Sequence, residues 1–399
     1  MADDPEAVAH ALRRLTWGPR SGEPEAVAEQ GLEAWLAAQL DPSSLDESAL
    51  AALLPSDPVP PASFASTQQA RQFARTLVRV MVEQKFLTAV HGVRQLEAVL
   101  VDFWFNHFNV FARKGLVGLY LAAYERTAIR PRVLGRFRDL LGAVAHAPSM
   151  LIYLDNWLSV GAQSPGGRGR GLNENYAREL LELHTLGVDG PYTQVDVVAV
   201  ARAFTGWTVD LATGQFTFAA ASHDAGPKVV LGVPLAGGGE AEGEQVLDLL
   251  AGHPATARHL ATKLARRFVG DAPPPSLVEA LAARYLDTGG DLRAVTAALV
   301  EAPEFSDPAV RLQKFKTPID FVLSLLRTTG APLPDARLLA ASLDELGMEP
   351  YQCLDPTGYA DEALVWLSPG SVVARMNAVL RYAGAPVPAA VGTPEFQYR

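Results

Sequence analysis

The chain has 399 residues, of which 49% are hydrophobic and 20% charged, a balance that is typical of a folded globular protein and excludes a disordered one. The formal net charge of -10 argues against a nucleic-acid backbone as the main partner, because phosphate binding requires a basic surface. The single cysteine, Cys353, excludes an intrachain disulfide and any metal site with several cysteine ligands.

Helical periodicity dominates the chain from its first residues onward. Segment 5–18 begins with proline and ends at glycine, both typical of helix ends. The periodic stretch from about Thr67 to Phe111 predicts two helices that are separated near Gly92. Thr193, with Asp196 three residues later, predicts a capping box at the start of another helix.

The pattern changes after residue 206. Segment 207–220 predicts two short strands around a turn, and segment 228–239 predicts a further strand and turn. We therefore expect a mainly α, multi-helical globular protein with a small β-hairpin insertion around 207–235. The insertion would separate an N-terminal helical half, 1–206, from a C-terminal helical half, 236–399, that packs on it.

The chain shows no signal for export or membrane insertion. Its N-terminus is acidic and lacks an apolar segment of signal-peptide length. No window reaches the length of about 18 uncharged apolar residues that a membrane span requires. We expect no membrane span, and a cytoplasmic protein as the chain is written, or an exported one if a leader has been removed.

Stretch 173–186 has one polar side when it is wound as an α-helix at about 100° per residue. His184 falls on the apolar side, so we expect it in the core. The polar side holds Glu174, Asn175, Arg178, Glu179 and Glu182.

Two interpretations of this polar side stay open. On a solvated face, Glu174–Arg178 and Arg178–Glu182 are i,i+4 ion pairs, each worth about 0.2–0.5 kcal/mol. In a cleft, Glu179 and Glu182 could share a cation, or one could stay protonated as an acid beside an ionised partner.

Three polar residues near the start of this helix bear on that choice. Asn173 and Asn175 favour the cleft slightly, because a single asparagine suffices as a helix cap. Asp155, at the end of the preceding helix, is either part of a helix-terminal turn or faces the same cleft.

A second polar segment, 102–114, places His107 among four phenylalanines and a tryptophan. A lone histidine on an aromatic helix is more often a core residue than a ligand. The flanking amides of Asn106 and Asn109 are unusual there, because each needs hydrogen-bond partners if it is buried.

A third segment, 219–232, brings His223, Asp224 and Lys228 into a loop before a strand. A turn built around aspartate and glycine explains it without any function. The alternative is a loop that delivers an imidazole, a carboxylate and an ammonium group to a site.

Common catalytic motifs are absent from the sequence. It contains no dinucleotide-binding glycine fingerprint, no phosphate-binding loop, no His-Glu-x-x-His zinc motif and no nucleophile elbow. The segments above therefore do not specify a reaction.

These segments do resemble a known family, the bacterial domain of unknown function 1800, over nearly the whole chain. The Asn-Glu-Asn-Tyr-Ala-Arg-Glu-Leu run and the Thr-Gly-Trp run that contains Trp207 are long and specific. The resemblance implies that the three polar segments form one family pattern, and it implies little about activity. Many members carry a leader. Further matching segments include LRRLTWGPR, GLEAWLAAQLDP, DFWFNHFNV, LGRFRDLLGAVAHAPSMLIYLDN, HDAGPKVVLG, HPATARHLATKLARRFV, GGDLRAVTAALVEAPEF, KTPIDFVLSLLR and DPTGYADEALVWLSP.

We expect the two helical halves to enclose a cleft lined by 102–113, 153–156, 173–184 and 223–228. The leading hypothesis is an enzyme of unknown reaction that acts on an anionic or polar substrate, either a small molecule or a polymer. Its expected catalytic residues are Glu179, Glu182, His107, His223 and Asp224. Its expected substrate-binding residues are Arg178, Lys228, Asn106, Asn173, Asn175 and Trp207.

A divalent metal is a further expectation, because carboxylates with imidazoles suit Mn, Fe or Zn, although no ligand spacing here is diagnostic. The expected ligands are Glu174, Glu179, Glu182, His107 and His223. The rival hypothesis is a non-catalytic scaffold or binding module, in which the same residues form a buried structural ion network.

Overall fold

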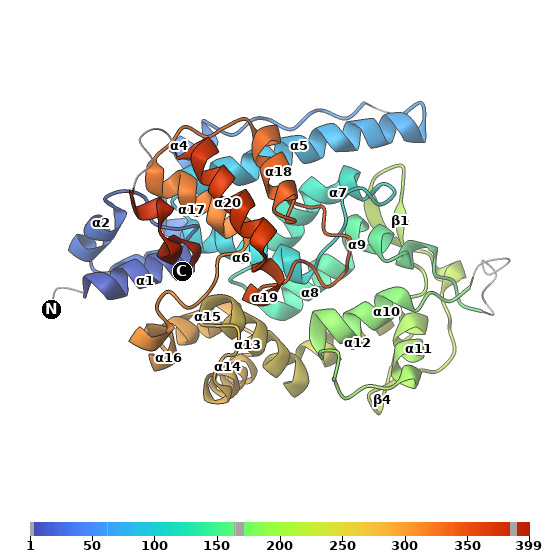
Figure 1. Ribbon diagram of the computed structural model, residues 1–399. Helices are drawn as coiled ribbons and strands as arrows, with labels where there is room; N and C mark the ends of the chain where they lie inside the picture. The colour runs from blue at the N-terminus through green and yellow to red at the C-terminus, as the bar shows by residue number, and fades with distance from the viewer. Residues whose placement is uncertain (1–3, 62, 163, 165–170, 384–388) are drawn as a thin grey trace.

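A computed structural model describes residues 4–61, 63–162, 164, 171–383 and 389–399 (Figure 1). The glycine-rich segment 161–171, whose composition predicts a flexible loop, lies for the most part outside these residues. Figure 1 shows α5 along one edge of the molecule, α17 and α20 beside it, and α13 to α15 along the opposite edge.

The helices form where the periodicity predicts them, and local caps fix their ends. The Ser66 hydroxyl accepts from the backbone N–H of Gln69 at the start of α5, and Gly92 ends that helix. The predicted capping box of Thr193 and Asp196 is present. The helices up to residue 206 are α1 (Pro5–Leu15), α2 (Glu23–Gln30), α3 (Leu32–Leu40), α4 (Ser48–Ala51), α5 (Thr67–His91), α6 (Gln95–His107), α7 (Val117–Ala123), α8 (Phe137–Ala145), α9 (Pro148–Tyr153), α10 (Asn175–Glu179) and α11 (Gln194–Ala203).

The C-terminal half is also helical, and prolines open most of its helices, as expected for a residue that cannot donate a backbone hydrogen bond. Its helices are α12 (Glu240–Ala251), α13 (Pro254–Phe268), α14 (Pro275–Asp287), α15 (Leu292–Glu301), α16 (Pro303–Ser306), α17 (Pro318–Thr329), α18 (Ala336–Glu345), α19 (Ala363–Trp366) and α20 (Pro369–Tyr382).

The β insertion consists of two antiparallel hairpins. The first pairs β1 (Trp207–Asp210) with β2 (Gln215–Phe218), and the second pairs β3 (Val229–Val230) with β4 (Val233–Pro234). The chain is therefore mainly α with a small hairpin insertion, which confirms the predicted fold class. Gly243 of α12 lies so close to β1 that an added Cβ would stand 2.4 Å from the Trp207 ring.

The segment predicted as one α-helix over 173–186 changes its winding partway. After α10, residues Leu180–Thr185 form a π-helical turn, η5, and the hydroxyl of Thr185 donates to the carbonyl of Leu180 at 2.6 Å. A second π-helical turn, η2 (Tyr124–Ile129), follows α7. Such turns insert one extra residue and are frequent at functional sites.

One hydrophobic core runs from Val8 to Val391 and includes side chains from both predicted halves. Helix α17 crosses this core and packs against α5, α18 and α20. The division into 1–206, 207–235 and 236–399 stays a prediction.

A buried carboxylate ties the start of α17 to two distant segments. Asp320 accepts from both terminal nitrogens of Arg267 on α13, at 2.9 and 3.0 Å, and from Arg399 at 3.1 Å. It also completes a capping box with Thr317. Burial opposes ionisation of Asp320, but Arg267 and Arg399 hold its pKa well below the ordinary value.

We expect Asp320→Asn to lower the free energy of unfolding by about 3–5 kcal/mol, because it leaves buried guanidinium groups without their counter-charge. Urea unfolding at neutral pH measures this. Since the folded pKa of Asp320 is depressed, the difference from wild type should shrink as the pH falls through the acid range. Asp287→Asn, at an exposed position of α14, is the control, and equal unfolding midpoints for the two variants would contradict the role of Asp320.

Candidate functional site

The polar side of α10 and η5 lies at a partly solvated surface. Arg178 lies 3.4 Å from Glu174 and 3.7 Å from Glu182, so both i,i+4 pairs are present. Arg178 also donates to the Gln194 side chain at 2.9 Å, and Gln194 donates to Glu174 at 2.7 Å. The guanidinium that we expected to hold a substrate is therefore already paired within the chain.

Glu179 differs from the other carboxylates of this helix. Burial, followed by the charge of Glu182, raises its pKa, and Arg178 opposes the shift. Glu182 hydrogen-bonds Tyr192, and burial together with that bond raises the pKa of Tyr192 to about 12. Among the predicted catalytic residues, Glu179 is the carboxyl group whose pKa is raised.

His107 belongs to a buried histidine cluster. Its ring centroid lies 6.3 Å from that of His184 on η5 and 6.1 Å from that of His259 on α13. Nε2 of His107 donates to the backbone carbonyl of His184 at 3.1 Å. Within the described chain, Nδ1 of His107 and both ring nitrogens of His184 have no hydrogen-bond partner.

Burial keeps this cluster neutral. It lowers the pKa of His107 well below the ordinary value, that of His184 to about 3 and that of His259 to about 4. Burial also lowers the pKa of the neighbouring Lys263 to about 8. Sequence reasoning missed His259 and Lys263, because no spacing links α13 to the other two segments.

The two amides beside His107 hold a distant loop. The Asn106 side chain donates to the carbonyl of Tyr359 and accepts from its N–H, both at 2.7 Å. Asn109 donates to the carbonyls of Cys353 and Asp355 at 3.0 and 2.7 Å. The partners that these amides require are thus backbone groups of a distant loop.

The polar residues around the start of α10 are also occupied locally. Asn173 accepts from the N–H of Asn175 at 2.8 Å and donates to the Leu154 carbonyl at 3.3 Å. Asn175 is exposed. Asp155 has a positive φ of 59° and pairs with Lys114 at 2.7 Å.

The His223 loop forms a network that closes on α11 and α12. His223 lies 3.2 Å, and Lys228 2.5 Å, from the same carboxylate oxygen of Glu242. Asp224 accepts two bonds of 2.9 Å from Arg202, which is the main reason that its pKa falls to about 2. Trp207, expected to bind a substrate, is fully buried below this loop and packs on Phe204 and Phe216.

The structure brings the first two polar segments together and leaves the third apart. His107 contacts His184, whereas no hydrogen bond, ion pair or ring contact among the described residues joins either of them to the His223 loop. Within the same residues, no group of three or more His, Cys, Asp or Glu side chains is placed to hold a metal ion. The metal and catalytic roles stay predictions.

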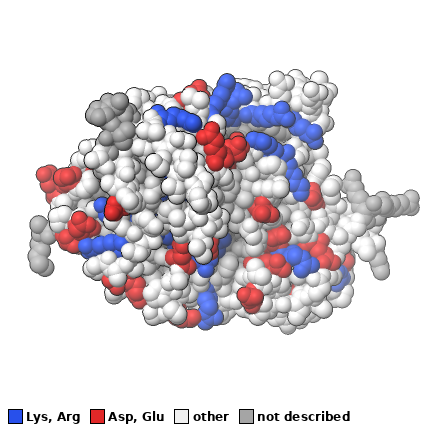
Figure 2. Space-filling view, viewed as in Figure 1, with Lys and Arg blue, Asp and Glu red and all other residues white. Residues whose placement is uncertain are grey.

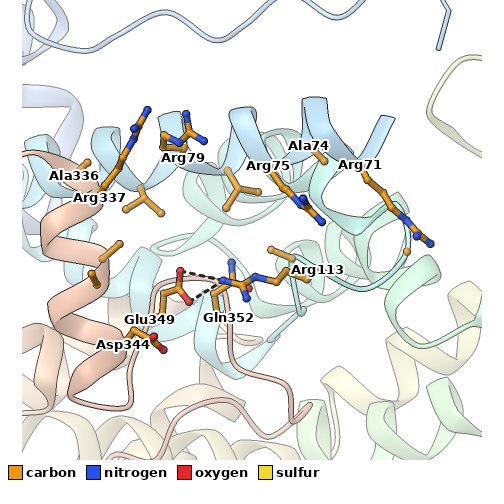
Figure 3. A pocket seen from close by; sticks show the side chains of 16 residues that line it. Arg71, Ala74, Arg75, Arg79, Arg113, Ala336, Arg337, Asp344, Glu349 and Gln352 are labelled. Carbon is orange, nitrogen blue, oxygen red and sulfur yellow. Dashed lines mark hydrogen bonds and ion pairs between the residues drawn. The ribbon is translucent and has the colours of Figure 1, made fainter. Parts of the chain in front are cut away.

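A groove that sequence reasoning missed lies between α5 and α18. It has a volume of about 560 Å³ and is also lined by the loops that follow α6 and α18. Figure 3 shows Arg71 and Arg75 extending from α5 toward the loop that carries Arg113, while Arg337 points from α18 toward α5 near Arg79.

Most of these guanidinium groups have no protein partner. Arg113 pairs with Glu349 at 3.1 Å, and Asp344 is the second carboxylate in the lining. The side chains of Arg71, Arg75, Arg79 and Arg337 make no hydrogen bond or ion pair with another described residue. Figure 2 shows basic side chains gathered over α5, in a chain whose net charge is -10.

Fold and groove together define a mainly helical protein with an arginine-lined groove. The chain belongs to the family described as "Protein of unknown function (DUF1800)", whose family model matches residues 10–396. No curated protein and no solved structure matches it. Across the described chain, no helix has the length and apolar character needed to cross a bilayer.

We expect the free energy of unfolding to fall as the pH drops from about 6.5 toward about 4. In this range the histidines bind protons in the unfolded state, where their pKa is ordinary, but not yet in the folded state, where burial lowers it, so protonation favours unfolding. For His259 alone the loss approaches about 3 kcal/mol at the acid end. Urea unfolding over this pH range measures it. His184→Phe removes one titrating group and should flatten the dependence, whereas exposed His91→Phe should change it less; an unchanged slope in His184→Phe contradicts this account.

Proposed function

We propose that this protein binds a ligand with several anionic groups in the arginine groove. The observation that carries the proposal is the set of four guanidinium groups, on α5 and α18, that have no partner among the described residues. Guanidinium groups recognise carboxylate, phosphate and sulfate through paired hydrogen bonds. The groove volume is also in the range of ligand sites.

Arginines elsewhere in the chain provide the comparison. Arg258 pairs with Glu279 at 2.7 Å, and Arg138 pairs with Glu244 and Asp248 at 2.6 and 2.5 Å. In an acidic chain such pairing is the expected outcome for a surface arginine. The unpaired groove arginines are therefore available to an external anion.

The spacing along α5 suits a ligand with more than one charge. Arg71, Arg75 and Arg79 follow one another at four-residue intervals, so their Cα atoms span about 12 Å along the helix axis. Ala74, Val78 and Ala340 supply apolar lining between the charges. An anion in the groove would contact charged groups from two sides.

The charge-neutral variant Arg75→Gln/Arg79→Gln tests the proposal, with inositol hexaphosphate as the probe. We expect wild type to bind the probe and the double variant to bind about tenfold more weakly, since two charge-assisted contacts are lost. Isothermal titration calorimetry at low ionic strength measures both, and added salt should weaken binding. The control Arg258→Gln/Arg284→Gln removes the same two charges from exposed positions of α13 and α14, and equal affinities for this control and the groove variant would refute the groove as the site.

A second candidate function is acid–base chemistry by Glu179, with or without a divalent metal. The raised pKa of Glu179, caused by burial and by Glu182, favours it. Under this candidate His107 or His223 carries protons or binds the metal, and the substrate is anionic or polar. It extends the enzyme interpretation of the sequence.

The metal version of this candidate is tested by elemental analysis of the purified protein. We expect one equivalent of Mn, Fe or Zn in wild type and a clear loss in Glu179→Ala and His107→Ala. Circular dichroism checks that each variant is folded; Glu179→Ala is the safer variant, because Glu179 is only half-buried. Equal metal content in all three proteins would contradict the metal version.

A further inference from the structure

We infer that the anion recognised by the groove is the headgroup layer of an anionic lipid surface, and that α20 inserts apolar side chains into that surface. This inference rests on the proposed function, because it names the ligand class of the same groove. It is carried by an exposed apolar stripe that lies one helix away from the arginines.

The stripe follows one side of α20. Val373, Met376 and Leu380 recur at helical spacing, and Met376 and Leu380 are 60% and 73% exposed. Arg375 and Val379, on the opposite side, are buried. Just before α20, Leu364 of α19 is 88% exposed, and Val365 and Leu367 are exposed as well. Several large exposed apolar side chains on consecutive elements mark an interaction surface.

The composition of α20 separates this stripe from ordinary surface helices. Residues Pro369–Tyr382 include two arginines and no aspartate or glutamate, although the chain holds 44 acidic residues. Arg375 is buried and Arg381 pairs with Ser342 and Glu345, so the free positive charge at this face comes from the groove arginines of α5 and α18. An exposed apolar helix side without carboxylates, next to such charge, is typical of helices that lie in a membrane interface.

Helix α18 connects the stripe to the groove. On one side, the Tyr382 hydroxyl of α20 donates to the Leu338 carbonyl at 3.1 Å and hydrogen-bonds Ser342. On the other side, α18 carries Arg337 into the groove. These bonds place the C-terminal end of α20 beside α18, and α18 in turn packs on α5, so one helix separates the stripe from the arginines of α5. Figure 2 shows the basic side chains beside a wide uncharged area over α20 on the same face.

A lipid surface accounts for both the groove arginines and the apolar stripe. A soluble polyanion would use the arginines and leave Met376 and Leu380 in water. An anionic bilayer offers charged headgroups to the arginines and, about 5–10 Å deeper, an apolar region to the stripe. Attraction between the arginines and the headgroups, and burial of the apolar stripe, would then both favour binding to the bilayer.

The experiment compares three forms of the full chain with the wild type. The stripe variant is Met376→Gln/Leu380→Gln, and the groove variant is Arg75→Gln/Arg79→Gln. The control is Val188→Gln/Val195→Gln, which removes two exposed apolar side chains from outside the stripe. Each is co-sedimented with vesicles of phosphatidylcholine and with vesicles of equimolar phosphatidylcholine and phosphatidylglycerol, and is titrated with inositol hexaphosphate.

We expect wild type and control to bind the vesicles that contain phosphatidylglycerol and not to bind vesicles of pure phosphatidylcholine. This binding should weaken at high salt. The groove variant should lose both vesicle and inositol hexaphosphate binding. The stripe variant should lose vesicle binding about tenfold or more while its affinity for inositol hexaphosphate stays unchanged. That split is the result that a soluble ligand would not give.

Other results overturn the inference in separate ways. Wild-type binding of inositol hexaphosphate without vesicle binding refutes the lipid surface and leaves the proposed function standing. Binding of neither refutes both. A wild-type dimer in light scattering that becomes a monomer in the stripe variant assigns the stripe to a second copy of the chain. Tight binding of a short DNA duplex that the stripe variant retains, with no vesicle binding, assigns the groove to nucleic acid.

Discussion

The buried carboxylate of Asp320 is the constraint on which the arrangement of the C-terminal half depends. It joins α17 to α13 through Arg267 and to the last described residue, Arg399. A buried carboxylate without such partners would be too costly to ionise, so the three groups fix one another. Because α17 packs on α5, α18 and α20, fixing its start also fixes the walls of the arginine groove and the helix that carries the apolar stripe.

The same principle explains what several of the polar segments hold together. Asn106 ties α6 to the backbone of Tyr359, and Glu242 ties His223 and Lys228 to α12. Asn106 joins segments that are far apart in the sequence, and Glu242 joins a loop to a helix. In both cases the contact satisfies polar groups that would otherwise be costly to bury. A cluster of polar residues in this sequence can therefore indicate a connection between distant segments as well as a chemical site.

Local signals made the helices, the hairpins and the capping boxes predictable, because periodicity and caps act within a few residues. The sequence does not show the π-helical turn at Leu180–Thr185, because its apolar residues fall on one side of the segment whether it is wound as an α-helix or as a π-helix. Nor does it show that Glu242 completes the His223 network, or that Arg337 faces α5 from more than two hundred residues away. The four-residue spacing of arginines on α5 was the one visible sign of the groove.

The arginine groove differs from the rest of the surface mainly in where the carboxylates lie, and less in how many arginines it contains. From its start at Thr67, α5 has no acidic residue before Glu83, and α20 has none at all. In a chain with 44 acidic and 34 basic residues, the absence of carboxylates over this part of α5 leaves Arg71, Arg75 and Arg79 without an ion pair among the described residues. On α20, by contrast, Arg381 lies 3.6 Å from Glu345. Since α17 packs on both α5 and α20, the positive charge and the apolar stripe gather on one face of the protein. An anionic partner would complete that face, as Asp320 completes the interior.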